Sequence, residues 1–325
     1  MDFSTIKDLP TLIRFLSNNS AIIIMAVSFL WGILVAISKS YRSYCLQFDE
    51  CAYTYQVGVV PVPAGVAKRA LAFAVDAYAV KGQSEAEWRL QLIERYDEFV
   101  NPFNSSGVDG FTLLTDDYLF VAFRGTSGLF DLFKDATSVP TRAHKGGAHR
   151  GFYKDADVSY HRLGLAKQVS DAIKNGKKIV TTGHSYGAAL AIEFAGKIIE
   201  HEGADKVALV CALCAPRSST KSRAYWLAKE LGAKVFRITY SRDVVPMVPP
   251  PVLYRHVGNT HYFDRNGDYH PLLTAGYRVF DTIGAILGDW VRLKFFAFLS
   301  YHSGSVVRNM VIAAINDGRI KTETS

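Results

Sequence analysis

Short apolar runs and longer helical patterns alternate along most of the chain. Apolar runs rich in β-branched residues occupy residues 178–182, 207–214 and 235–240, and such runs predict buried strands. Helical patterns of 12–16 residues lie among them, at 161–175, 186–201 and 220–231. Strands that alternate with helices in this way indicate an α/β fold, with a mainly parallel sheet that helices cover on both faces.

The region before residue 125 continues this pattern. Small and apolar residues from 64 to 80 predict a buried helix, and the capping-box signature at Ser84–Glu87 predicts a second helix through residue 98. The apolar runs 110–114 and 118–123 predict two strands joined by a tight turn at 115–117.

One segment is too apolar for a soluble fold. Residues 21–37 are seventeen residues without a charge, at the short end of what spans a bilayer. We expect a retained N-terminal transmembrane helix. The alternatives are a signal peptide cleaved near Ala36-Ile37-Ser38 and a buried core helix. The expected division is a tail and membrane anchor at 1–38, a linker at 39–52 and one α/β domain at 53–325.

Composition and charge narrow the possible partners. The 325 residues are 49% hydrophobic, 21% charged and 13% aromatic, which supplies a large core and excludes a disordered chain. The net charge of +7 is scattered, without a nucleic-acid motif, so no nucleic-acid partner is expected. An anionic membrane surface suits such a chain, and two basic residues on each side of segment 21–37 leave its orientation open.

Four cysteines bear on metal binding and compartment. Cys211 and Cys214 have C-x-x-C spacing, but no second pair at ligand spacing follows and both extend an apolar run. A buried strand is therefore expected there, and not a metal site. Cys45 and Cys51 could pair in an oxidising compartment, which the sequence does not identify.

A possible nucleophile lies between a predicted strand and a predicted helix. Gly183-His184-Ser185-Tyr186-Gly187 fits the G-x-S-x-G pattern of a nucleophile elbow, whose serine projects above the sheet. The flanking glycines avoid collisions where strand and helix close around the serine. The alternative is a glycine-rich turn with an incidental serine.

A serine needs a base and a carboxylate that orients the base. Asp243 follows the predicted strand 235–240, and strand-end loops are where α/β folds place their chemistry. His302 is the expected base, because it comes last in the order Ser, Asp, His. His184, His256 and His261 are alternatives, although the last two lie in a stretch that indicates a loop.

Backbone N–H groups are expected to form an oxyanion hole. One belongs to Tyr186, directly after the serine, and the other to Thr126, in the Arg-Gly-Thr turn after strand 118–123. The apolar cluster of Leu129, Phe130, Leu132 and Phe133 predicts a lid over the site. Its alternative is a short helix packed in the core.

A set of motifs follows in order along residues 53–305: Phe123-Arg-Gly-Thr126, Asp131, Asp135, Val139-Pro140, His149-Arg-Gly-Phe152, Gly183-His-Ser-Tyr-Gly187, Ala215-Pro-Arg217 and Arg242-Asp-Val-Val-Pro246. Together they resemble the class 3 (fungal-type) triacylglycerol lipases, of the α/β-hydrolase fold. The resemblance implies that Ser185 is the nucleophile, Asp243 the acid, His302 the base and Thr126 an oxyanion-hole residue. It also implies a mobile lid at about 128–136. The N-terminal apolar segment makes the chain similar to a membrane-tethered relative.

These features predict a serine ester hydrolase that acts on lipid esters at a membrane, with triacylglycerol or a related acylglycerol as substrate. A phospholipase or general carboxylesterase with the same triad is an alternative. A non-catalytic, membrane-tethered binding protein of the same fold is the rival from another class. No metal, organic cofactor or protein partner is indicated. The expected location is a membrane, through a single N-terminal span, or the outside of the cell after signal cleavage.

Overall fold

The computed structural model describes residues 59–78, 83–96, 99–105, 107–125, 139–249, 251, 253–258, 260–271, 278, 281–282, 284–285 and 302–323. The expected membrane anchor, the linker, Cys45, Cys51, Thr126 and the predicted lid lie outside these residues. Among the described residues, no helix combines the length and the apolar character needed to cross a membrane.

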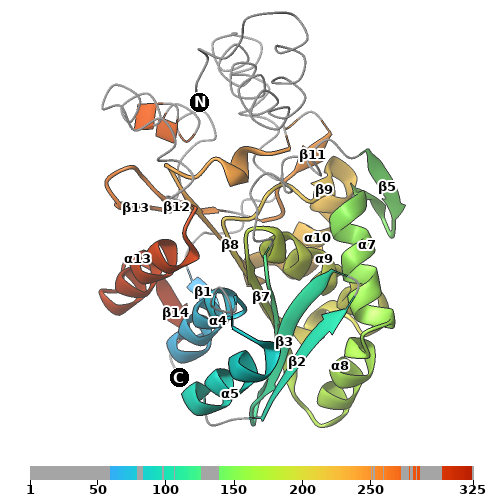
Figure 1. Cartoon of the computed structure of the whole chain (residues 1–325). Coiled ribbons are helices and arrows are strands. Elements are labelled where there is room, and N and C mark those ends of the chain that lie inside the picture. Colours follow the sequence, from blue (N-terminus) through green and yellow to red (C-terminus); the bar gives the residue numbers. More distant parts are fainter. Residues whose placement is uncertain are drawn as a thin grey trace, which may run out of the picture.

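A mixed sheet forms the centre of the described part of the chain, with eight strands in the order β13-β12-β10-β8-β7-β4-β3-β2 (Figure 1). The five strands from β12 to β4 are parallel, and β13, β3 and β2 join antiparallel at the edges. The bounds are β2 Phe99–Ser105, β3 Val108–Leu114, β4 Tyr118–Phe123, β7 Lys178–His184, β8 Val207–Leu213, β10 Val235–Tyr240, β12 Thr260–Phe263 and β13 Tyr269–His270. The parallel centre agrees with the sequence pattern, and the antiparallel edges make the sheet mixed.

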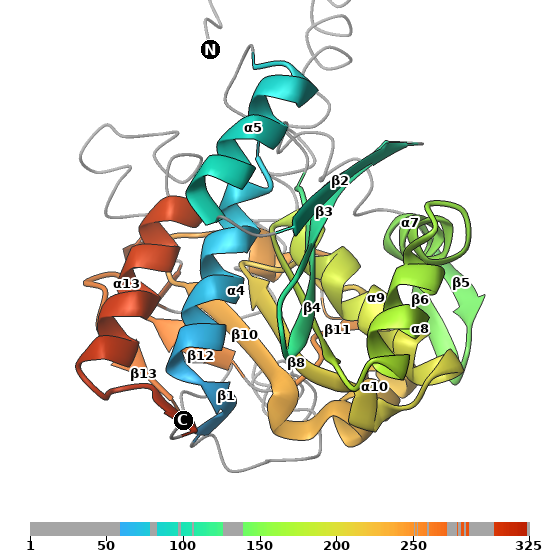
Figure 2. The same cartoon turned by 90° about the horizontal axis from the view of Figure 1, so that it is seen from below.

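Helices cover both faces of this sheet (Figure 2). One face packs against α4 Ala64–Asp76, α5 Glu85–Tyr96 and α13 Gly304–Asn316. The other packs against α7 Arg150–His161, α8 Leu165–Lys174, α9 Tyr186–His201 and α10 Lys221–Leu231. Short 3-10 helices occur at Ala204–Lys206, Gly232–Lys234 and Val245–Met247. Two hydrophobic cores, one on each face, hold the layers together.

Two smaller sheets complete the described fold. Strands β1 Val59–Pro63 and β14 Lys321–Glu323 pair in parallel. Strands β11 Tyr254–Arg255, β9 Ser219–Thr220, β6 Gly146–His149 and β5 Pro140–Ala143 form a four-stranded antiparallel sheet. Strand β1 leads directly into α4. Its pairing with β14 joins the first and the last described strands of the chain.

Local sequence signals explain several of these elements. The predicted capping box is present before α5: Ser84 N–H donates to Glu87 Oε2 at 2.7 Å, and Glu87 N–H donates to Ser84 Oγ at 3.2 Å. Helix α9 is buried from Tyr186 to Ile198, because it packs on the sheet beneath α7 and α10. Strand β12 corrects the interpretation of this stretch as a loop. Its run of four residues becomes a strand by pairing with β10.

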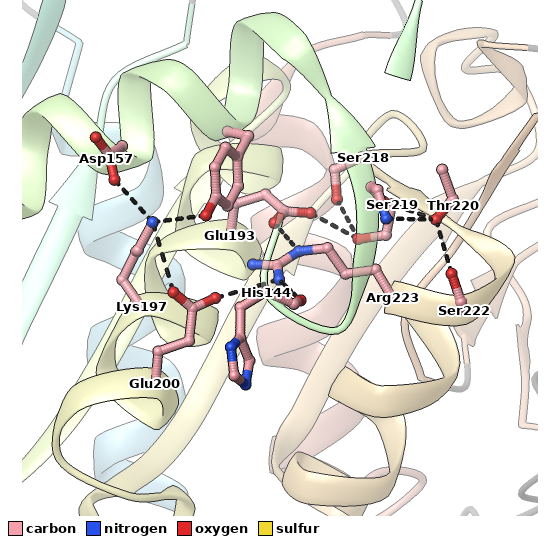
Figure 3. A network of polar contacts seen from close by, with 12 residues as sticks. His144, Asp157, Glu193, Lys197, Glu200, Ser218, Ser219, Thr220, Ser222 and Arg223 are labelled. Atoms are coloured by element: carbon pink, nitrogen blue, oxygen red, sulfur yellow. Dashed lines mark hydrogen bonds and ion pairs between the residues drawn. The ribbon is translucent and has the colours of Figure 1, made fainter. Parts of the chain in front are cut away.

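A buried network of charges ties α9 to its neighbours (Figure 3). Arg223 on α10 and Glu193 on α9 form an ion pair with Nε and Oε2 2.7 Å apart, and neither side chain is exposed to solvent. Glu193 Oε1 also accepts a hydrogen bond from Ser219 Oγ at 2.6 Å. On the next turn, Lys197 forms an ion pair with Asp157 on α7 at 2.7 Å. The network therefore links α7, α9 and α10, and through Ser219 on β9 it also reaches the four-stranded sheet.

Candidate active site

The candidate site lies where parallel strands end. Ser185 directly follows β7, Cys214 directly follows β8, and Asp243 comes three residues after β10. Because these strands run in the same direction, their carboxyl ends meet at one edge of the sheet. His302 reaches this edge from the segment just before α13. The fold thus gathers residues that are up to 117 positions apart.

Ser185 occupies a sharp and strained turn. Its φ of 60° and ψ of −124° are rare for a residue with a side chain. A β-carbon on Gly183 would lie 2.4 Å from the backbone of Gly187, and one on Gly187 would lie 2.2 Å from the carbonyl oxygen of Phe123. Both glycines are therefore needed for the close approach of β7, α9 and β4. This is the geometry of a nucleophile elbow.

Asp243 and His302 form a buried hydrogen-bonded pair. His302 Nδ1 lies 2.8 Å from Asp243 Oδ2, and the side chains are 5% and 0% exposed. The other carboxylate oxygen, Oδ1, accepts the backbone N–H of Val245 at 2.9 Å. His302 Nε2 is buried and has no hydrogen-bond partner among the described residues. In this arrangement the carboxylate holds one imidazole nitrogen and leaves the other for proton transfer.

His184 supports the imidazole of His302 from the side. The two ring centroids are 4.5 Å apart, with the planes inclined by 32°. Tyr78, which follows α4, places its hydroxyl 3.0 Å from His184 Nδ1. Burial, followed by the proximity of His302, holds the pKa of His184 well below its usual value. His184 therefore remains neutral and packs beside the dyad.

Cys214 completes the floor of the site. Potential ligand atoms of His184, Cys214 and His302 all lie within 4.8 Å of one another. Burial, and then the charge of Asp243, raise the pKa of the Cys214 thiol well above its usual value. Both effects favour the protonated form of the thiol. The sequence predicted a buried strand over both cysteines. Cys214 is buried, but β8 ends at Leu213, one residue before it.

The two other histidines considered as the base have different partners, and the structure describes one of the two expected oxyanion-hole residues. His261 is on β12, its Nδ1 lies 2.8 Å from the Tyr269 hydroxyl, and burial lowers its pKa to about 3. His256 Nε2 lies 2.8 Å from the carbonyl oxygen of Pro246. The backbone N–H of Tyr186 stands at the start of α9, where helix N–H groups favour negative charge. Thr126 lies outside the described residues.

Part of the chain that contains Ser185 and Asp243 matches a known family. Residues 120–253 match the family model described as "Lipase (class 3)". Over these residues the chain is similar to the class 3 lipases. The matched segment begins within β4, includes the elbow and Asp243, and ends at the residue before β11.

Two plant proteins are similar in sequence. Phospholipase A1-II 6 of Oryza sativa subsp. japonica is 30% identical over 173 residues, which cover 43% of this chain and 42% of that protein. Triacylglycerol lipase OBL1 of Nicotiana tabacum is 31% identical over 96 residues, which cover 27% of this chain and 17% of that protein. The chain thus spans less than half the length of either relative.

Solved lipase structures share the fold. The nonglycosylated LIP2 lipase of Yarrowia lipolytica superposes with a TM-score of 0.53 at 21% identity, covering 65% of this chain and 82% of that one. The lipase of Rhizopus microsporus var. chinensis gives a TM-score of 0.52 at 20% identity, covering 65% and 84%. The mixed sheet flanked by helices is accordingly an α/β-hydrolase fold.

Proposed function

We propose that this protein hydrolyses the carboxylic esters of lipids, with triacylglycerol or a related acylglycerol as substrate. The observation that carries the proposal is the 2.8 Å contact between His302 Nδ1 and Asp243 Oδ2, at the sheet edge that holds the strained Ser185. One structural neighbour, a triacylglycerol lipase with a TM-score of 0.54, has a serine protease triad as its catalytic centre. The same three residue types support a triad here.

In the proposed reaction, Ser185 Oγ attacks the ester carbonyl while His302 Nε2 takes its proton. Asp243 orients the imidazole and stabilises the imidazolium. The backbone N–H of Tyr186, with that of Thr126, donates to the oxyanion of the tetrahedral intermediate. The imidazolium then protonates the leaving alcohol, and a water activated by His302 releases the acid from the acyl-enzyme. Every step uses groups of the chain, the ester and water.

A phospholipase A1-type activity is the second candidate, because one relative is a phospholipase A1. The same serine attack would then fall on a glycerophospholipid ester. Assays that use triacylglycerol and phosphatidylcholine in the same detergent micelles, and read fatty acid release, separate the two. Faster release from the phospholipid would favour the second candidate. A non-catalytic binding protein of this fold would release none.

Ser185→Ala tests the nucleophile, with Ser222→Ala as a matched control on the exposed start of α10. We expect the Ser185 variant to stay folded, to lose ester hydrolysis by at least about a thousandfold, and to lose labelling by a fluorophosphonate. The Ser222 variant should keep both. Retained turnover in the Ser185 variant would overturn the assignment. His302→Ala should reduce turnover nearly as far, and the double variant little further, because the base acts through the nucleophile.

We further propose that residues 21–37 anchor the lipase domain to a membrane. The support is the uncharged run itself and its place before every candidate site residue. Deleting residues 1–38 should release the protein from membranes while preserving hydrolysis of a soluble ester. A mature protein that begins near residue 38 would instead establish a cleaved signal and secretion.

A further inference from the structure

The hydroxyl of Tyr78 lies where three segments of the candidate site meet. Tyr78 follows α4, and its Oη is 3.0 Å from Nδ1 of His184 and 3.4 Å from the carbonyl oxygen of the same residue. The backbone of Gly125, two residues beyond β4, packs on this hydroxyl, since a β-carbon there would lie 2.0 Å from Tyr78 Oη and 2.7 Å from the His184 carbonyl oxygen. One hydroxyl therefore joins the segment after α4, the loop after β4 and the last residue of β7.

This hydroxyl orients the ring of His184. The histidine is 4% exposed, and its Nε2 is buried without a hydrogen-bond partner among the described residues. Its Nδ1 is therefore the ring atom through which a hydrogen bond sets the ring plane, and Tyr78 supplies that bond. Backbone packing narrows the space further, because a β-carbon on Gly304, the first residue of α13, would lie 3.1 Å from Cγ of His184.

The oriented ring of His184 in turn limits the motion of His302. The two ring centroids are 4.5 Å apart, and the planes are inclined by 32°. The single hydrogen bond between Nδ1 and Asp243 leaves the His302 imidazole able to swing about that bond, and contact with a second ring beside it restricts the swing. Proton transfer requires the other ring nitrogen to point at the reacting group within hydrogen-bonding reach. The contact between the rings therefore bears on the step in which the base acts.

We propose that Tyr78 is a positioning residue that acts through His184 on the base, His302. The hydroxyl fixes the His184 ring, and that ring holds the His302 imidazole in the plane that proton transfer requires. Because Tyr78 acts at second hand on the chemical step, its loss lowers kcat and leaves the binding of the ester unchanged. The inference rests on the proposed hydrolase function and deepens it.

Tyr78→Phe removes the hydroxyl and keeps the ring. We expect kcat to fall about fivefold with KM unchanged, which is the effect of one ordinary hydrogen bond. Tyr96→Phe is the matched control. Tyr96 ends α5, is half-buried like Tyr78, and donates its hydroxyl to Asp76 at the end of α4. The control loses a hydroxyl hydrogen bond at the same helix end, so it should lower the melting temperature while kcat stays at the wild-type value.

A double-mutant cycle tests the path through His184. His184→Phe keeps a ring beside His302 but offers no nitrogen to the Tyr78 hydroxyl. It should lower kcat by a factor similar to that of Tyr78→Phe. Adding Tyr78→Phe to it should then change kcat by less than about twofold, because the hydroxyl has already lost its partner. A further fivefold loss in the double variant would show that Tyr78 acts independently of His184 and would overturn the proposal.

One measurement on the full chain needs no turnover. The proton that the Asp243 carboxylate holds on His302 Nδ1 can be followed by NMR. In Tyr78→Phe it should exchange with water at least about threefold faster than in the wild type, because a less restrained ring breaks its hydrogen bond more often. Faster exchange in Tyr78→Phe and not in Tyr96→Phe supports the positioning role even if no ester is hydrolysed. If Tyr78→Phe lowers only the melting temperature, and both kcat and exchange stay at the wild-type values, the hydroxyl only stabilises the fold and the proposal is overturned.

Discussion

Removing Arg223 should destabilise the fold strongly, because it leaves a carboxylate buried without its counterion. Glu193 on α9 is fully buried. Without the guanidinium it would retain the hydrogen bond from Ser219 Oγ at 2.6 Å. Arg223 also donates to Glu200 at 3.2 Å and to the carbonyl oxygen of His144 at 2.6 Å. One substitution therefore takes a donor from three acceptors.

The magnitude follows from the burial of both partners. Breaking a fully buried ion pair by removing one side costs about 3–5 kcal/mol. We expect Arg223→Met to fall within that range, a large fraction of the roughly 5–15 kcal/mol that stabilises a typical domain. Replacing Glu193 by Gln as well removes the stranded charge and keeps an acceptor for Ser219. The double variant should recover more than half of the loss.

Urea unfolding of the wild type, of Arg223→Met and of the double variant, followed by circular dichroism, measures these differences in unfolding free energy. The surface pair of Lys167 and Asp171 on α8 is the control, since its side chains are 82% and 47% exposed. Lys167→Met should change the unfolding free energy by less than about 0.5 kcal/mol. A cost below about 1 kcal/mol for Arg223→Met, or a double variant less stable than the single one, would refute this reasoning.

Two further predictions concern the elbow and acid stability. Gly187→Ala should destabilise the protein by more than about 2 kcal/mol and abolish activity, because its β-carbon would strike the Phe123 carbonyl. Gly65→Ala, in open space on α4, should be neutral or stabilising by up to about 1 kcal/mol; equal urea midpoints for the two variants would contradict this. His261 has a folded pKa of about 3, below its unfolded value of about 6.5. The neutral, buried imidazole of His261 therefore contributes its full share to the free energy of unfolding above pH 6.5, and this share is lost as the pH falls toward 3. Wild type should therefore lose roughly 3 kcal/mol more than His261→Asn between pH 6.5 and 4; parallel unfolding curves would contradict it.

Elements with a strong local signal were predictable from the sequence. Strand β10 and helix α9 have the predicted bounds, 235–240 and 186–201, because continuous apolar runs and a clear strand-to-helix turn define them. Strand β12 was not predictable, since four residues between polar segments become a strand only through pairing with β10. Helix α7 was also missed. Its sequence, RGFYKDADVSYH, is mostly polar, and its helical state depends on packing against α9.

In the candidate site, too, some features were predictable from local sequence and others depend on tertiary packing. The pattern around Ser185 predicted the elbow, and chain order predicted that Asp243 and His302 would be partners. The structure brings those two side chains within hydrogen-bonding distance, while their catalytic roles stay a prediction. The floor of the site could not be predicted. Cys214 and Tyr78 reach it from the residues just after β8 and α4, and no local pattern records which side chains meet across the sheet.

The position of β1 sets how a tether would hold this domain. The described domain begins at β1, and α4 then runs toward the site, since Tyr78 just beyond it contacts His184. A helix of thirteen residues is about 20 Å long. If the domain is attached only through the segment before β1, its point of attachment lies at the end of α4 that is remote from Ser185. The twenty residues 39–58 have a contour length of up to about 70 Å. This length is several times that of α4, so if residues 21–37 are anchored as proposed, covalent geometry would allow the domain to turn Ser185 toward the same bilayer.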